Sequence, residues 1–248
     1  MGLYSNSHLI CYLFLSLALL VVSEMALSQP DRNRRPEIEM RSVEQVLAQH
    51  GNRVTMRLKP RFRFVGVGWP PEAVTLLAFK DTRLLELWAL SDGNWRHIRD
   101  YRVKAMSGGP GPKLREGDLQ VPEGAYRIEG LNPMSAYHLS LKLDYPSALD
   151  REQAILDGRT NLGGDIYIHG KDVSQGCLAI GDKAIEDLFV LTALLGKEQV
   201  SILISPRDFR SRPLLPGASL SPAWIQALYE GIEADLKRFP LENKGRVE

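Results

Sequence analysis

The sequence has very little cysteine and almost no net charge. Cys11 and Cys177 are its only cysteines, and neither a C-x-x-C nor an H-E-x-x-H spacing occurs among its 248 residues. Zinc sites usually recur at such short spacings, so a metal centre has no support here. The 31 Lys and Arg residues nearly cancel the 30 Asp and Glu residues. Without a strongly basic surface, we expect no nucleic-acid partner.

Internal repeats, heptad runs and low-complexity tracts are also missing. With 44% apolar and 25% charged residues, the chain can bury one good hydrophobic core. We therefore expect a single domain with appendages.

An uncharged, mostly apolar run covers residues 10 to 23. It suits the hydrophobic part of a secretory signal and is short for a membrane span. The small residues of Ala26-Leu27-Ser28 favour cleavage there, so we expect residues 1–28 to be a signal peptide and the mature protein to be exported to the periplasm or cell envelope. No Lys or Arg precedes Arg32, which leaves an uncleaved anchor as an alternative. Cys11 lacks the small preceding residue of a lipoprotein signal.

Export would leave Cys177 as the sole cysteine, with no intramolecular disulfide partner in an oxidising compartment. An unpaired thiol is a liability there unless it performs chemistry. His169 lies eight positions earlier, and histidine is the usual base for activating a cysteine. The segment from Ile166 to Cys177 is therefore the strongest candidate for an active site.

Hydrophobic periodicity predicts short strands and three helices. A lead-in helix over residues 37 to 50 stops at Gly51, a second has Asp182 as N-cap and ends at Gly196, and a closing amphipathic helix starts at Ser221-Pro222. Strands are expected over residues 74–79, 84–90, 95–104, 126–128, 137–143, 165–169 and 200–204, the first two as a hairpin. Alternation in the strand 165–169 puts His169 on the face opposite Ile166 and Ile168.

Several sequence blocks, taken in order, resemble the L,D-transpeptidase (YkuD-type) catalytic domain, most of all its YafK-like branch. They are GPGPKLREGD (109–118), VPEGAY (121–126), SAYHL (135–139), DYP (144–146) and the final His-Gly and Ser-Gln-Gly-Cys block (169–177). The resemblance covers roughly residues 74–205 and implies a strand-rich α+β catalytic domain, a mixed β-sandwich or barrel with flanking helices. Residues 29–73 would form a polar connector and lead-in helix, and residues 206–248 a loop and amphipathic helix.

The resemblance also implies a chemistry. Cys177 would attack an amide of a peptidoglycan stem peptide and hold the acyl group as a thioester, with His169 as the base. In family members the acyl group comes from the L-centre of meso-diaminopimelate, and the leaving group is a terminal D-alanine. The acceptor is a second diaminopimelate amine, the lysine of a wall-attached lipoprotein, or water. No metal and no organic cofactor is implied.

Elementary chemistry agrees with these roles. An adjacent imidazolium can lower the pKa of a thiol below its usual value of about 8.5. Gly176 lets the backbone approach a substrate carbonyl, and the N–H groups from Gln175 to Cys177 are candidates for an oxyanion hole. The other expected contributors are Ser174, to orient His169 or bind substrate, Gly170, to fix the turn that aims His169, and Tyr137 and His138, as groove residues.

Two features depart from the family pattern. Longer-motif members separate the histidine and cysteine by about fifteen or more residues and place an arginine shortly after the cysteine, whereas here Leu178-Ala179 follows Cys177. If that arginine seats the donor substrate, then Arg151, Arg159 or Lys171 must replace it, or the substrate differs.

Each candidate also has a simpler interpretation. Cys177 alone could be a buried small hydrophobe, and His138 a core histidine. His138, His169 and Cys177 could instead bind zinc. The other motif residues read as structural, namely Lys113, Asp118 and Glu123 in loop turns and Trp88, Trp95 and Trp224 in packing. Three functions therefore stay open, which are a cysteine acyltransferase, a hydrolase of diaminopimelate-linked amides such as protein–peptidoglycan links, and a non-catalytic wall-binding module.

Overall fold

The computed structural model describes residues 40–214 and 222–241. From Arg41 onward they belong to one compact unit. Its helices are α2 (Val43–Phe64), α3 (Ala148–Leu156), α4 (Asp182–Leu195) and α5 (Trp224–Leu236), with a 3-10 helix η1 (Lys197–Gln199). Its strands are β1 (Ala73–Phe79), β2 (Leu84–Ser91), β3 (Asn94–Arg102), β4 (Gly124–Asn132), β5 (Ser140–Leu143), β6 (Tyr167–His169), β7 (Leu178–Ala179) and β8 (Val200–Ser205). Within the described ranges, no helix combines the length and apolar character needed to cross a membrane.

The eight strands form one mixed sheet in the order β3-β2-β1-β8-β4-β5-β6-β7. The expected hairpin is confirmed, because β1 and β2 pair antiparallel with Leu76 opposite Leu87. Strand β8 comes last in the chain but lies inside the sheet, parallel to β1 and antiparallel to β4. The strand-rich α+β class expected from the sequence is therefore confirmed.

The chain beyond β3 joins the far end of this sheet. Lys104 N–H donates to the Ala179 carbonyl at 2.7 Å, and Ala179 N–H donates to the Ala105 carbonyl at 3.0 Å. Because β3 and β7 stand first and last in the strand order, these bonds curl the sheet back on itself in the manner of a barrel. Cys177 directly precedes β7 and so lies at the seam of the curled sheet.

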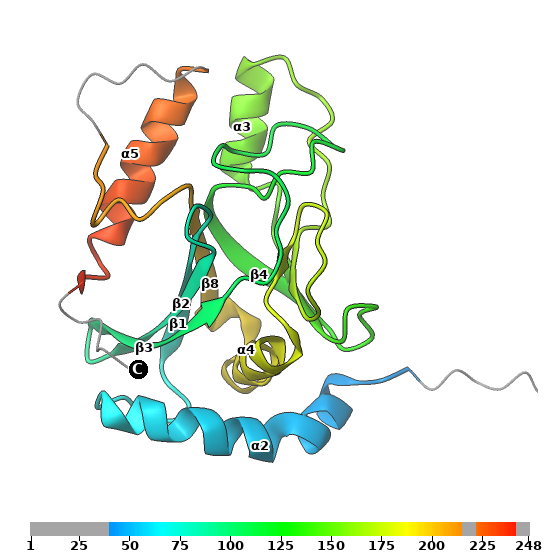
Figure 1. Cartoon of the computed structure of the whole chain (residues 1–248), viewed down its shortest axis with the longest axis vertical. Helices are drawn as coiled ribbons and strands as arrows, with labels where there is room; N and C mark the ends of the chain where they lie inside the picture. The colour runs from blue at the N-terminus through cyan, green and yellow to red at the C-terminus, as the bar shows by residue number, and fades with distance from the viewer. Residues whose placement is uncertain (1–39, 215–221, 242–248) are drawn as a thin grey trace, which may run out of the picture. The chain divides into compact units, whose positions relative to one another are not determined.

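Alternate residues of the central strands face two separate hydrophobic cores. In β1, Leu76 and Ala78 belong to the larger core with α2 and α4, whereas Leu77 and Phe79 belong to a smaller core with α5. Figure 1 accordingly shows α2 and α4 on one side of the sheet and α5 on the other. A strand that is apolar on both faces requires cover on both faces, and the helices supply it.

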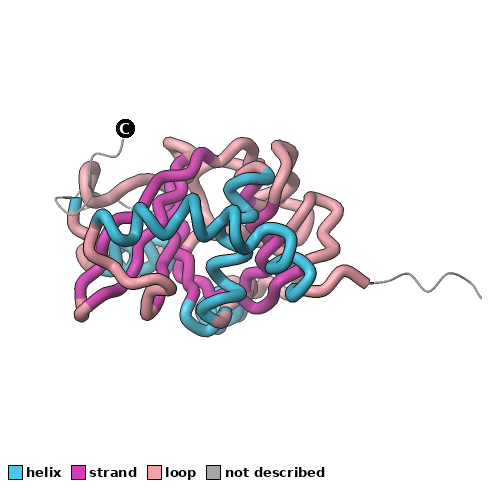
Figure 2. The backbone as a smooth tube through the Cα atoms, turned by 90° about the horizontal axis from the view of Figure 1, so that it is seen from below, coloured by secondary structure: helices cyan, strands magenta, loops and turns pink. Residues whose placement is uncertain are grey.

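The expectation that the lead-in helix stops at Gly51 is wrong. Helix α2 continues through Gly51 and Pro60 to Phe64, and Figure 2 shows it crossing the strands. Glycine and proline inside a helix cost about 1 and about 3 kcal/mol relative to alanine. Burying each large apolar side chain returns about 1.5–3 kcal/mol, which outweighs that cost. The buried stripe is Val46, His50, Val54, Leu58 and Phe62, about one residue per turn.

Two other helix starts differ from the sequence expectation. The N-cap of α4 is Gly181, and Asp182 is its first helical residue, with its carboxylate accepting the Lys171 N–H at 2.8 Å. The expected end at Gly196 is confirmed. Helix α5 begins at Trp224, with Ala223 as the preceding residue, while the proposed cap Ser221 lies outside the described residues.

Helix α3 was not expected at all. A capping box starts it, since the Asp150 N–H donates to Ser147 Oγ and the Asp150 carboxylate accepts the Ser147 N–H. Its burial pattern gives no amphipathic signal, because Ile155 and Leu156 are 78% and 73% exposed and Ala154 alone is buried. The capping residues, rather than a hydrophobic stripe, were the available clue.

Candidate active site

The candidate base and nucleophile lie at two neighbouring strands. His169 is the last residue of β6, and Cys177 directly precedes β7. The two strands pair in parallel, with Ile168 opposite Leu178 and His169 opposite Ala179. Continuing this register puts Cys177 beside Tyr167, two residues before His169 along the strand. Cys177 lies one residue outside β7, and standard strand spacing puts its Cα roughly 8 Å from that of His169.

His169 is buried, with 2% of its surface exposed. Its Nδ1–H donates to the Gly170 carbonyl at 2.7 Å, which assigns the proton of the neutral ring to Nδ1 and leaves the lone pair on Nε2. Burial lowers the pKa of His169, and the hydrogen bond to Gly170 opposes this. The resting imidazole is thus neutral with a free lone pair, the form that acts as a general base.

The Cys177 thiol is partly buried and donates to the Asp165 carbonyl at 3.7 Å. Burial raises the pKa of Cys177, the charge of Asp165 raises it further, and a Tyr167 backbone hydrogen bond and the Lys113 ammonium oppose this. Burial thus disfavours a thiolate in the resting protein, and activation of the Cys177 thiol by His169 stays a prediction. Among the described residues, no hydrogen bond joins the Cys177 sulfur to His169, and the pair rests in its neutral form.

Two serine hydroxyls brace the backbone at the cysteine. Ser174 Oγ donates to the Cys177 carbonyl at 2.5 Å and accepts the Cys177 N–H at 3.0 Å. Ser107 Oγ accepts the Gly176 N–H at 2.5 Å. An oxyanion at either amide must therefore displace a serine. Ser174 positions the cysteine backbone here, and the exposed Gln175 carries an N–H with no partner among the described residues.

Gly170 and Gly176 are required for different reasons. A Cβ on Gly170 would lie 2.5 Å from the Tyr137 carbonyl oxygen and 2.6 Å from Asp182 Oδ1, closer than real Cβ atoms come. Gly176 has space, but its φ of +91° disfavours any L side chain. The first therefore packs the turn after His169 against its neighbours, and the second permits the turn into Cys177.

Tyr137 and His138 reach the site in different ways. The Tyr137 ring stacks on the His169 imidazole, with centroids 4.5 Å apart. His138 has a φ of +77° and points to α4, where its Nε2 lies 3.1 Å from Glu186 Oε1. Glu186 also contacts His50 Nδ1 at 3.3 Å, so α2 is linked to the loop that carries Tyr137. The sequence alone does not single out Glu186 or His50, because polar helical residues carry no signal of their partners.

The structure brings together a different set of possible metal ligands from His138, His169 and Cys177, which were considered from the sequence. In the described part of the chain, the candidate ligand group is His50, His138 and Glu186, with ligand atoms within 4.8 Å of one another. Arg41 Nη2 lies 3.1 Å from His50 Nε2, and Arg53 Nη2 lies 2.9 Å from His50 Nδ1. Guanidinium groups at both ring nitrogens oppose a cation. This cluster is better described as an ion-pair network.

Lys113 is the cation whose charge lowers the pKa of Cys177. The sequence had instead suggested Arg151, Arg159 or Lys171 as the cation at the site. The Lys113 ammonium donates to Asp118 Oδ1 at 2.6 Å and to the Arg115 carbonyl at 2.9 Å. Arg159 instead binds Asp157, Lys171 donates to the Ala136 carbonyl at 2.7 Å, and Arg151 is exposed. The expected loop-shaping role of Lys113 and Asp118 is thus confirmed, and Lys113 adds an electrostatic one.

A family model for the L,D-transpeptidase catalytic domain, YkuD, matches residues 74–202. That range covers just over half of the chain and includes His169 and Cys177. The chain therefore belongs to the YkuD L,D-transpeptidase catalytic domain family.

A curated relative carries a name from the same family. "Putative L,D-transpeptidase YafK" of Escherichia coli strain K12 is 33% identical over 140 residues, which cover 55% of this chain and 54% of that protein. The chain thus spans about half the length of the curated relatives it matches.

Two solved structures are more distant. The helical cell shape determining protein Pgp2 from Campylobacter jejuni is 22% identical with a TM-score of 0.46, covering 62% of this chain and 56% of Pgp2. L,D-transpeptidase 1 from Mycobacterium tuberculosis is 11% identical with a TM-score of 0.32, covering 54% and 62%. With both TM-scores below 0.5, the family match alone carries the assignment.

Proposed function

We propose that this chain is an exported cysteine acyltransferase that acts on peptidoglycan stem peptides through a thioester at Cys177. The observation that supports the proposal is the pairing of β6 with β7, because His169, a buried imidazole protonated at Nδ1, ends β6 and Cys177, a partly buried thiol, directly precedes β7. Family membership supplies the substrate class. Export rests on residues 1–28, which lie outside the described residues.

The neutral resting pair defines the first chemical step. As Cys177 Sγ attacks the amide carbonyl carbon at the L-centre of diaminopimelate, its proton moves to His169 Nε2. The tetrahedral intermediate then collapses, the C–N bond breaks, and the imidazolium returns the proton to the leaving amine. An acceptor amine or water attacks the thioester, gives its proton to His169 Nε2, and releases the thiol.

Hydrolysis is the second candidate. The connection from His169 to Cys177 is short, and the thiol is partly exposed, which leaves room for water at the thioester. An acceptor amine outcompetes water at roughly tens of molar only when it is held in near-attack geometry. A site with few ordering elements therefore favours cleavage of diaminopimelate-linked amides, such as the link to a lipoprotein lysine.

One experiment tests the proposal and separates the candidates. Purified protein is incubated with tetrapeptide muropeptides and, separately, with a protein-linked muropeptide, and the products and intact protein are weighed by mass spectrometry. Acyltransfer gives cross-linked dimers, hydrolysis gives released peptide, and both give an acyl adduct on Cys177 that Cys177→Ala lacks. A wild-type protein with neither adduct nor product would instead be a wall-binding module.

A further inference from the structure

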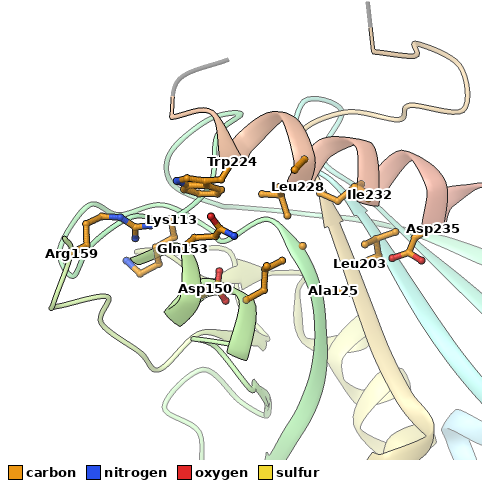
Figure 3. Close-up of a pocket in the computed structure, with 14 residues that line it drawn as sticks. Lys113, Ala125, Asp150, Gln153, Arg159, Leu203, Trp224, Leu228, Ile232 and Asp235 are labelled. Carbon is orange, nitrogen blue, oxygen red and sulfur yellow. The ribbon is translucent and has the colours of Figure 1, made fainter. Parts of the chain in front are cut away.

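A cavity of about 220 Å³ lies between α3 and α5, over β4 and β8 (Figure 3). Helix α5 lies beyond residues 74–202, so the cavity is partly built from outside the matched family domain. Pockets for drug-sized ligands usually measure about 300–1,000 Å³. This smaller space suits a single amino-acid residue rather than a sugar chain.

The ends of the cavity carry opposite charges. Figure 3 places Lys113 and Arg159 at one end and Asp235 at the other. The wall between them is mostly aliphatic, with Ala125, Leu203, Leu228 and Ile232. The polar exceptions are Gln153 and Asp150, whose carboxylate already accepts the Ser147 N–H and the Tyr126 hydroxyl. A complementary ligand has a carboxylate and an ammonium separated by an aliphatic chain.

Polar atoms at both ends still have bonding capacity. Lys113 Nζ uses two of its three N–H donors within the protein. The Asp235 carboxylate makes no ion pair with another described residue, and the buried Gln153 Oε1 has no hydrogen-bond partner within the described part of the chain. Buried polar atoms are normally paired, so Gln153 points to a missing donor.

Gly231 opens the wall that α5 contributes. Glycine inside a helix costs about 1 kcal/mol relative to alanine. At Gly231 a Cβ would meet no heavy atom within 4 Å, and the residue lines the cavity. A side chain added there would have open space around its Cβ at the wall of the cavity.

Lys113 connects this cavity to the cysteine. It lines the cavity, and its charge opposes the raised pKa of the Cys177 thiol. An anion bound to Lys113 would therefore be sensed at the nucleophile.

We propose that the cavity between α3 and α5 binds a lysine-like residue, with a carboxylate at Lys113 and a terminal ammonium at Asp235. This deepens the proposed function and rests on it, because a lipoprotein lysine with a free carboxylate has this chemistry. The cavity would then bind an acceptor lysine through α5, a helix outside residues 74–202.

The test is direct binding of Nα-acetyl-L-lysine to the full protein, measured by calorimetry at low salt. The expected result is saturable binding that weakens at least tenfold for Nα,Nε-diacetyl-lysine, which lacks the ammonium, and for Nα-acetyl-lysine amide, which lacks the carboxylate. Asp235→Asn should weaken binding by roughly ten- to a hundredfold, the effect of losing a charged hydrogen-bond partner. Glu230→Gln removes one negative charge from the exposed face of α5 and should change little.

Gly231→Leu fills the cavity and should abolish binding while keeping or raising the melting temperature. Cys177→Ala should bind as the wild type does and lose activity. A wild-type protein that binds the probe but shows no activity on muropeptides would count against the proposed function and not against this site. No measurable binding, equal binding of the three probes, or full binding by Gly231→Leu would overturn the inference.

Discussion

The Tyr137 ring lies against the His169 imidazole, with ring centroids 4.5 Å apart and planes inclined by 34°. Tyr137 is 43% exposed, whereas His169 is 2% exposed, so the tyrosine covers the base from the solvent side. The contact has two consequences, because it restricts the rotamer of His169 and keeps water from the ring.

Replacing Tyr137 by Leu should therefore affect both rate and pH dependence. Loss of a stacked ring removes about 0.5–1.5 kcal/mol, which predicts a decrease in kcat of about two- to tenfold. With less desolvation, the pKa of His169 should rise towards its ordinary value, and the acid limb of the activity profile should move to higher pH. Tyr137→Phe keeps the ring and is the matched control. An unshifted profile in Tyr137→Leu would show that the stacking does not tune the base.

Because His169 and Cys177 both rest uncharged, the pH dependence of activity should differ from the pH dependence of thiol labelling. His169 must be unprotonated to act, and burial lowers its pKa, so activity should persist below pH 6.5 and fall only as pH drops through that lowered value. Because burial raises the pKa of Cys177, iodoacetamide labelling of the resting enzyme should be slow at neutral pH and rise only above the usual range of a free thiol.

His169→Ala distinguishes this mechanism from a preformed ion pair. It should reduce acylation by roughly 10²- to 10⁴-fold, the usual cost of losing a positioned base, yet leave the pH profile of alkylation nearly unchanged. A thiolate stabilised by His169 would give the opposite pattern, with the labelling profile moving to higher pH in the variant.

Glu186 should act as a positioning residue for the Tyr137 loop. Its carboxylate contacts His50, His138 and Arg53, and its side chain is 11% exposed. Glu186→Gln leaves these groups without their anion and should lower the free energy of unfolding by about 2–4 kcal/mol. If the network also aims Tyr137, kcat should fall in the still-folded variant, with the same acid-limb shift as Tyr137→Leu. Glu198→Gln, near the C-terminal end of α4, is the control.

Lys80 and Glu123 test how the glycine- and proline-rich loop is held. Their side chains are fully buried and 3.1 Å apart, and Glu123 also accepts bonds from the Gly111 N–H and the Tyr229 hydroxyl. Lys80→Met leaves Glu123 as an unpaired buried charge and should cost about 3–5 kcal/mol in chemical denaturation. The double variant Lys80→Met with Glu123→Gln should recover part of that loss, and a double variant as unstable as the single one would argue against charge burial as the cause.

The sequence by itself determined the local strands and singled out the candidate reactive groups. Alternating apolar residues predicted the hairpin of β1 and β2, and the pattern around Ile168 put His169 at the end of a strand, because these features depend on neighbours a few residues apart. The sequence blocks led to the correct family. The role of Glu123 in shaping its loop also followed from its block, although its partner Lys80 did not.

Tertiary structure decided everything that depends on distant contacts. Helix α2 passes through Gly51 and Pro60 because its apolar stripe is buried against the core, a gain that no local propensity contains. The pKa of Cys177 is raised rather than lowered because burial acts on the thiol while His169 is bonded to Gly170. Only the tertiary fold brings Lys113 close enough for its charge to act on the Cys177 thiol. Sequence periodicity records which face of an element is apolar, but charge and burial at a site depend on which elements meet there.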